Sequence, residues 1–130
     1  MATNTDLAGL GMPPLLANEL GAALPIAITA AGTTYAGSTK IKSNQYLVNC
    51  TNANNTLSVG LPPFGGDTGC SLADWFMVVN ASVDSLVIRA STGVLIAAGG
   101  TNDSSLVLGA GKSVLLRPTT TVAWGGLVGA

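Results

Sequence analysis

The stretch WFMVVN (75–80), with DSLVIRAS (84–91) and VLIAA (94–98) after it, decides the fold class. All three runs are short and rich in Val, Ile and Leu, and turn-forming Asn, Ser, Thr and Gly residues separate them. Short apolar runs bounded by such residues are typical of β-strands. WFMVVN is apolar almost without interruption, which indicates a strand covered on both faces. The centre of the chain is therefore predicted to be β-structure.

The same pattern of short apolar runs separated by turn-forming residues continues on both sides of this central stretch. Short strands at roughly 8–12-residue spacing with Gly- and Asn-rich turns indicate a sandwich or a barrel. Continuous apolar runs also suit a parallel sheet, but no helix-length segment lies between them to make the crossovers. We therefore expect an all-β chain, a single antiparallel β-sandwich or barrel-like domain over residues 25–130. The further predicted strands are PIAITAAG (25–32), QYLVNC (45–50), TLSVGL (56–61), SSLVLGA (104–110), KSVLLRP (112–118) and TVAWGGLVG (121–129).

Residues 1–24 differ from the rest and are expected to form an extended N-terminal docking arm. Pro13 and Pro14 suit the first turn of a short helix that runs to Leu20, and Gly21 would end it. One or two helical turns do not stand alone in water. The arm must therefore pack on a partner or, alternatively, on its own domain. The side chains expected to dock on a partner are Leu7, Leu10, Met12, Pro13, Leu15 and Leu16.

Charge is scarce along the whole chain. Charged residues make up 8% of the sequence and hydrophobic residues 48%, with a net charge of −1, whereas a typical soluble domain has about 25% charged residues. This predicts a coat of Asn, Ser and Thr together with surface that partners cover. The cations are too few and too dispersed to neutralise many phosphates, so we expect no nucleic-acid partner. They are Lys40, Lys42, Arg89, Lys112 and Arg117.

We also expect no targeting signal. No run approaches the roughly 20 apolar residues of a membrane-spanning helix, and the first residues carry no cationic segment of a signal peptide. We therefore expect no membrane partner and a protein that is made in, and stays in, a cytosol. In that reducing setting Cys50 and Cys70 are expected to be buried thiols, with a disulfide as the less favoured alternative.

Residues for catalysis are few. The chain has no histidine, which removes the commonest general base and metal ligand. Asp67 and Asp74 are the nearest pair of acids for glycoside hydrolysis, but a turn and a strand start explain them more simply. GAGKS (109–113) lacks the earlier glycine and the following helix of a phosphate loop, so we interpret it as a hairpin turn with an exposed Lys112. We expect no enzyme, cofactor or metal, and an exposed Phe64 as a further partner contact.

Several short motifs follow one another between Ala31 and Trp124: AGTT (31–34), Leu61-Pro62, VVNAS (78–82), LVIRASTG (86–93), LGAGKS (108–113) and TTTVAW (119–124). Their order resembles a module of tailed-phage virion proteins. In that module an Ala-Gly-Thr-Thr start precedes an Asn-rich strand region and a Leu-Pro turn. A strand ending in Val-x-Asn, a Thr-Gly turn, a Gly-Lys-Ser turn and a last strand ending near tryptophan follow. This chain departs from it at Ile88-Arg89-Ala90, where Asn-Gly turns and a Tyr-Pro pair are usual. The stretch AGLGMPPLLANELG (8–21) is similar to short leader segments of phage structural proteins.

The resemblance implies a non-enzymatic virion structural protein, a capsid cement or decoration protein on the outer capsid surface. It would bind the major capsid protein and copies of itself, as a homotrimer, and it would be made in the host cytoplasm. The alternative is a phage fibre or tail-tip module that recognises a host surface glycan through polar loops at 62–70 and 99–104. The scarcity of charge favours the first, because neighbours cover much of the surface of a lattice component.

Overall fold

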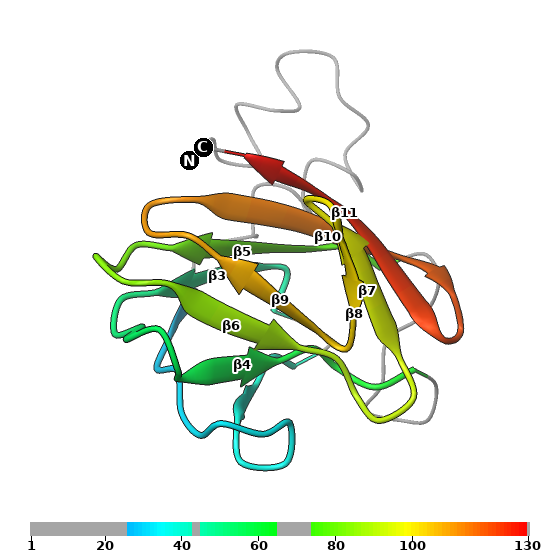
Figure 1. The fold of residues 1–130 in the computed structure, drawn as a ribbon, viewed down its shortest axis with the longest axis horizontal. Helices are drawn as coiled ribbons and strands as arrows, with labels where there is room; N and C mark the ends of the chain where they lie inside the picture. The colour runs from blue at the N-terminus through cyan, green and yellow to red at the C-terminus, as the bar shows by residue number, and fades with distance from the viewer. Residues whose placement is uncertain (1–25, 43–44, 65–73, 130) are drawn as a thin grey trace, which may run out of the picture.

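The computed structural model describes residues 26–42, 45–64 and 74–129, and these contain strands and no helix (Figure 1). The expected all-β class is confirmed for this part of the chain. Eight strands fall inside the predicted runs and β10 extends two residues beyond its run, whereas β2 and β8 were not predicted. The strands are β1 (Ile26–Ile28), β2 (Thr39–Lys40), β3 (Leu47–Cys50), β4 (Ser58–Gly60), β5 (Phe76–Asn80), β6 (Leu86–Arg89), β7 (Leu95–Ala98), β8 (Thr101–Asp103), β9 (Ser105–Leu108), β10 (Ser113–Thr120) and β11 (Ala123–Gly129).

The strands form two sheets. A seven-stranded sheet has the order β1-β3-β5-β10-β11-β7-β8, and a four-stranded sheet has the order β2-β4-β6-β9. Both orders are open, so neither sheet closes into a barrel. From β1 to β7 the chain changes sheet at every strand. In Figure 1, β10 and β11 lie above β9, β6 and β4.

The expectation of antiparallel sheets is wrong, because five of the nine strand pairings are parallel. The physical reason is the alternation between sheets. β3 and β5 are parallel neighbours, and the chain between them passes through β4 in the other sheet. A strand of the opposite layer thus makes the crossover that usually requires a helix. The antiparallel pairs are confined to partners of β7, β9 and β10.

Both sheets contribute side chains to one hydrophobic core. Trp124 of β11 is fully buried at its centre. Its ring lies edge-on to the Phe76 ring, with 5.6 Å between the ring centroids. It stacks on the Phe64 ring, with 5.2 Å between the centroids. Burying one large apolar side chain contributes about 1.5–3 kcal/mol. Other fully buried members of the core are Val48, Val59, Leu61, Val78, Leu86, Ile88, Ile96, Leu108 and Leu116.

Asn80, at the end of β5, joins turns from different parts of the chain and is fully buried. Its Nδ2 lies 2.8 Å from the carbonyl oxygen of Asp84, 3.0 Å from that of Leu108 and 3.1 Å from that of Gly109. Its Oδ1 accepts a hydrogen bond from the Ser82 amide at 3.0 Å. A buried amide that is satisfied in this way fixes the surrounding backbone. The Val-x-Asn motif therefore has a structural role here.

The GAGKS stretch (109–113) forms a turn with an exposed Lys112, as predicted. The Lys112 amide donates to the Gly109 carbonyl oxygen at 3.1 Å. The prediction of a hairpin is wrong, because β9 belongs to the four-stranded sheet and β10 to the seven-stranded sheet. The turn therefore connects the two layers and does not connect paired strands.

Candidate functional site

The structure describes only one of the predicted docking residues, Phe64. Leu7, Leu10, Met12, Pro13, Leu15 and Leu16 lie outside the described residues, and so does the predicted arm of residues 1–24. Phe64 is described, but it is half-buried and packs on Trp124. The expected exposed ring is therefore wrong. The segment from Leu61 to Phe64 follows β4. Its first residue is held against the four-stranded sheet, because the Leu61 amide donates to the Arg89 carbonyl oxygen at 2.9 Å.

The described residues offer little for catalysis or metal binding. They contain no group of three or more His, Cys, Asp or Glu side chains that could hold a metal ion. Cys50 is a buried free thiol, while Cys70 and Asp67 lie outside the described residues. Asp74 precedes β5 and is half-buried. No helix in the described part of the chain is long and apolar enough to cross a membrane.

The first candidate site is the outer face of the seven-stranded sheet. Alternation along β10 turns Val114 and Leu116 into the core and leaves Leu115 exposed. The register places Leu115 opposite Met77 of β5 on one side and Leu127 of β11 on the other. Leu47 of β3 lies opposite Met77 in turn. These four side chains form one apolar row across four adjacent strands. We call this row, together with Leu95 of β7, the apolar sheet face.

The apolar sheet face is exposed on β7, β10 and β11, whereas Leu47 of β3 and Met77 of β5 are half-buried. Leu127 is 75% exposed, Leu95 43% and Leu115 38%. In the six described strands from β1 to β7 in the sheet order, Arg117 is the only charged residue. A sheet that faces water normally carries polar side chains at these alternate positions. An exposed apolar patch of this kind marks an interaction surface.

The second candidate site lies on the outer face of the four-stranded sheet, at the end of β6. Leu86 and Ile88 are fully buried in the core, so the alternation turns Arg89 to the opposite face. Arg89 lies between Gly60 of β4 and Ser105 of β9 in the sheet. The segment that connects β1 to β2 folds over Gly60. This segment forms a wall beside Arg89 and creates a pocket.

Gly60 is necessary for this close approach of the connecting segment. A Cβ atom at Gly60 would lie 2.7 Å from Ser38 Oγ and 3.0 Å from Tyr35 Cε2, which is too close. The segment is also tied to the sheet, because the Tyr35 hydroxyl donates to the Leu61 carbonyl oxygen at 2.8 Å. The Lys40 ammonium donates to the carbonyl oxygens of Tyr35, Ala36 and Ser38 and lies 4.4 Å from the centre of the Tyr35 ring. Lys40 is therefore engaged in holding the wall.

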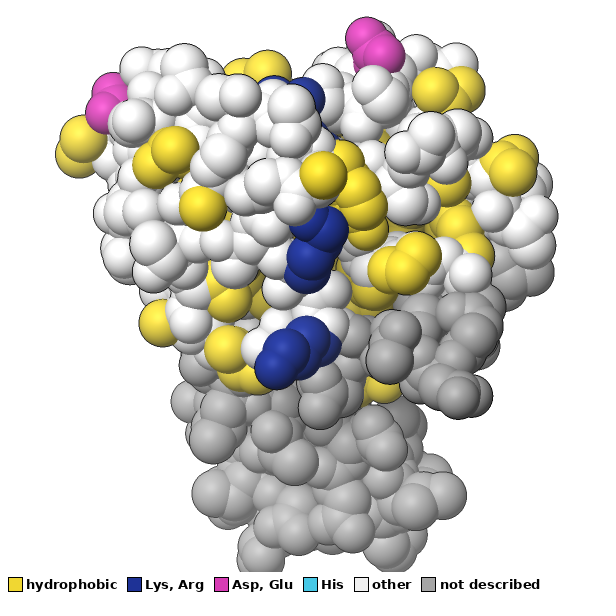
Figure 2. Space-filling view, turned by 90° about the horizontal axis from the view of Figure 1, so that it is seen from below, with side chains coloured by type: hydrophobic (Ala, Val, Ile, Leu, Met, Phe, Trp, Pro, Cys, Tyr) yellow, Lys and Arg dark blue, Asp and Glu magenta, His cyan; other side chains and the backbone are white. Residues whose placement is uncertain are grey.

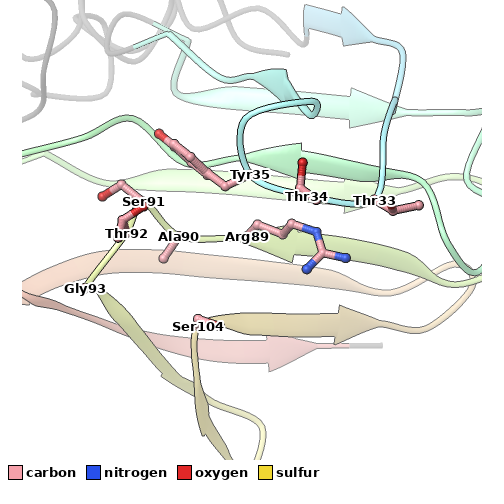
Figure 3. A pocket seen from close by; sticks show the side chains of 9 residues that line it. All are labelled: Thr33, Thr34, Tyr35, Arg89, Ala90, Ser91, Thr92, Gly93 and Ser104. Carbon is pink, nitrogen blue, oxygen red and sulfur yellow. The ribbon is translucent and has the colours of Figure 1, made fainter.

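The pocket beside this wall has a volume of about 380 Å³. Figure 3 shows the Arg89 guanidinium on the side of the pocket where Thr33 and Thr34 lie. The Nε atom of Arg89 is buried and has no hydrogen-bond partner, and no carboxylate forms an ion pair with the guanidinium in the described part of the chain. On the underside of the molecule in Figure 2, charged side chains are few. The pocket is lined by Thr33, Thr34, Tyr35, Arg89, Ala90, Ser91, Thr92, Gly93 and Ser104.

No protein-family model, curated protein or solved structure matches this chain. Sequence reasoning treated Arg89 only as a dispersed cation, and the signal that it missed was an arginine inside the apolar run LVIRAS (86–91). The threonines at positions 33 and 34 gave no signal, because only the folded chain brings them beside β6.

Proposed function

We propose that the protein is a tailed-phage virion structural protein, a capsid cement or decoration protein that binds the outer capsid shell as an oligomer. The observation that carries this proposal is the apolar sheet face, which is exposed and has almost no charge. Depletion of charged residues is the compositional mark of the core of a protein interface. Such a face stays soluble when a neighbouring subunit covers it. The order of phage-like motifs supports the same class of protein.

The size of the apolar sheet face suits contact between subunits. Six strands at about 4.8 Å spacing span roughly 25 Å, and the seven residues of β11 extend over roughly 23 Å. The product of these dimensions, at most roughly 575 Å², is about 70% of the roughly 800 Å² that each partner contributes to a standard interface, so this face would supply most of such a contact. We therefore assign this face to the contact between copies in a homotrimer. The predicted arm of residues 1–24 would then bind the major capsid protein.

Shell binding would stabilise the capsid by mass action, because the protein binds the assembled shell and not its separated subunits. The test is the copy number in purified particles that carry this chain, measured by gel densitometry against the major capsid protein. A cement protein is present in a fixed, high ratio over the whole shell. A few copies at one vertex or at the tail would contradict the proposal. Imaging of labelled particles separates these two results directly.

A second candidate function is a fibre or tail-tip module that recognises a host surface glycan. The observation that favours it is the pocket at Arg89, whose lining is mostly hydroxyl side chains. Sugar recognition depends on such hydrogen-bonding groups placed in a preformed cavity. The loops expected to bind glycan were 62–70 and 99–104, and the pocket includes only Ser104 from them. Low copy number in particles together with glycan binding would favour this function.

A further inference from the structure

We infer that the pocket at Arg89 binds a carboxylate-bearing sugar unit, such as a uronic acid residue of an acidic polysaccharide. The inference deepens the second candidate function, and it does not depend on shell binding, because the apolar sheet face belongs to the other sheet. Three features of the pocket carry it. They are an unpaired guanidinium, free hydroxyl groups, and a wall that is already in place.

The guanidinium requires an anion. An arginine side chain is always charged, and withdrawing a charge from water is costly unless a partner of opposite charge is present. Arg89 is half-buried, its Nε has no hydrogen-bond partner, and no described carboxylate pairs with it. A planar guanidinium matches a carboxylate with two parallel hydrogen bonds. The pocket therefore provides an unmet cationic group that a ligand carboxylate would satisfy.

The hydroxyl groups around Arg89 suit a sugar ring better than a bare anion. Each serine or threonine hydroxyl offers one donor and two acceptor positions, which are also the groups that sugars present. The side-chain hydroxyls of Thr33, Ser91 and Thr92 form no hydrogen bond within the described structure. Thr34 Oγ1 accepts a bond from the Gly37 amide at 3.2 Å and keeps its own proton to donate. Thr33 and Thr34 lie on the side of the guanidinium, whereas Ser91 and Thr92 lie at the other end of the pocket (Figure 3).

The wall formed by the segment between β1 and β2 is held before any ligand arrives. Gly32 has a φ of +69°, and a Cβ atom there would lie 2.4 Å from the Gly37 carbonyl oxygen. The buried Ser58 hydroxyl lies 3.1 Å from the Gly32 carbonyl oxygen and donates to it. A preformed site loses little free energy to ordering on binding. The pocket volume, about 380 Å³, lies in the range of roughly 300–1,000 Å³ that small-ligand sites occupy.

The experiment is a titration of the full chain with sodium glucuronate, followed by NMR or calorimetry at constant ionic strength. Glucose, acetate and inorganic phosphate are titrated in parallel. We expect saturable glucuronate binding, with each of the other three at least about tenfold weaker. Arg89→Gln should weaken glucuronate binding by about tenfold or more, because it removes a charge-assisted pair. Arg117→Gln is the matched control and should bind as the unaltered protein does, because Arg117 is exposed on the other sheet.

A second variant tests the hydroxyl groups without altering the charge. Thr33→Val with Thr92→Val should weaken glucuronate binding and leave the weak acetate binding unchanged. This variant also provides the test if Arg89→Gln does not fold. The inference is overturned if glucuronate does not bind saturably, if acetate or phosphate binds as tightly as glucuronate, or if Arg89→Gln or the double threonine variant binds glucuronate normally. A failure of this kind leaves the oligomeric state unchanged and is therefore distinct from a failure of the shell-binding proposal.

Discussion

The outer faces of the two sheets differ, although alternation along the strands produces both. The face of the seven-stranded sheet is an apolar row, exposed on β10 and β11 and half-buried on β3 and β5, with one nearby cation, Arg117. The face of the four-stranded sheet is partly covered by the segment between β1 and β2, and it presents Arg89 among hydroxyl groups. This difference is the basis of the two proposals. The first face suits a second protein surface, and the second suits a small polar ligand.

The largest effect is expected from two neighbouring leucines of β10 that lie on opposite sides of the sheet. Leu116 is fully buried, whereas Leu115 is 38% exposed. Leu116→Ala should lower the free energy of unfolding by about 2–5 kcal/mol, because it leaves a cavity in the core. Leu115→Ala should lower it by less than about 1 kcal/mol when measured below the concentration of assembly. Urea denaturation measures both, and equal losses would show that the two faces are assigned wrongly.

Substitution of Asn80 tests whether the stability of the fold depends on the hydrogen bonds between its side chain and the surrounding turns. Asn80→Ala leaves the carbonyl oxygens of Asp84 and Leu108 without this donor and should cost about 2–3 kcal/mol of folding free energy. Asn102→Ala is the control, because Asn102 is exposed on β8 and should change stability by less than about 0.5 kcal/mol. Thermal unfolding compares the two variants. A loss at Asn80 no larger than that at Asn102 would contradict the structural role of its amide.

The Gly60→Ala variant should alter the outer face of the four-stranded sheet and leave that of the seven-stranded sheet unchanged. The added methyl group would displace Ser38 and Tyr35 from the four-stranded sheet at a cost of about 1–3 kcal/mol. We expect loss of ligand binding at Arg89 and an unchanged oligomeric state. Gly109→Ala is the control, because a Cβ atom there would meet only the flexible Lys112 side chain, at 3.4 Å. Normal ligand binding by Gly60→Ala would show that the wall does not form the site.

The smallest effect is expected at Lys112, in the turn between the sheets. Its side chain is exposed and belongs to neither candidate site. Lys112→Ala should change the free energy of unfolding by less than about 0.5 kcal/mol and should alter neither glucuronate binding nor assembly. Titration with ATP should show no binding that depends on Lys112. Binding that disappears in this variant would revive the phosphate-loop interpretation of GAGKS (109–113).

The sequence allowed prediction of the strands but not of their arrangement. Runs such as WFMVVN (75–80) and KSVLLRP (112–118) carry the local signal of a β-strand. β2 was missed because it has two residues, Thr39 and Lys40, without an apolar pattern. β8 was missed because Thr101–Asp103 consists of residues that are common in turns. The parallel pairing was missed because the crossovers run through the opposite sheet, which is a property of the whole fold.

The candidate sites could likewise be predicted only in part, because their residues come together only in the folded chain. The scarcity of charge in the sequence predicted covered surface, but the register of β3, β5, β10 and β11 determines where the apolar row lies. Phe64 was predicted to be exposed, and only the position of Trp124 from the far end of the chain explains its burial. The pocket needed the approach of Thr33 and Thr34 to Arg89, which are separated by more than fifty positions in the sequence.

The most direct test of the central claim is analytical ultracentrifugation of the full chain and of the double variant Leu115→Asp with Leu127→Asp. Both leucines are exposed and paired across β10 and β11, so the two carboxylates would place charge in the middle of the proposed interface. The unaltered protein should sediment as an oligomer, and the double variant as a folded monomer. Val107→Asp, on the exposed side of the four-stranded sheet, should remain oligomeric. A monomeric unaltered protein, or a double variant that still assembles, would contradict the account.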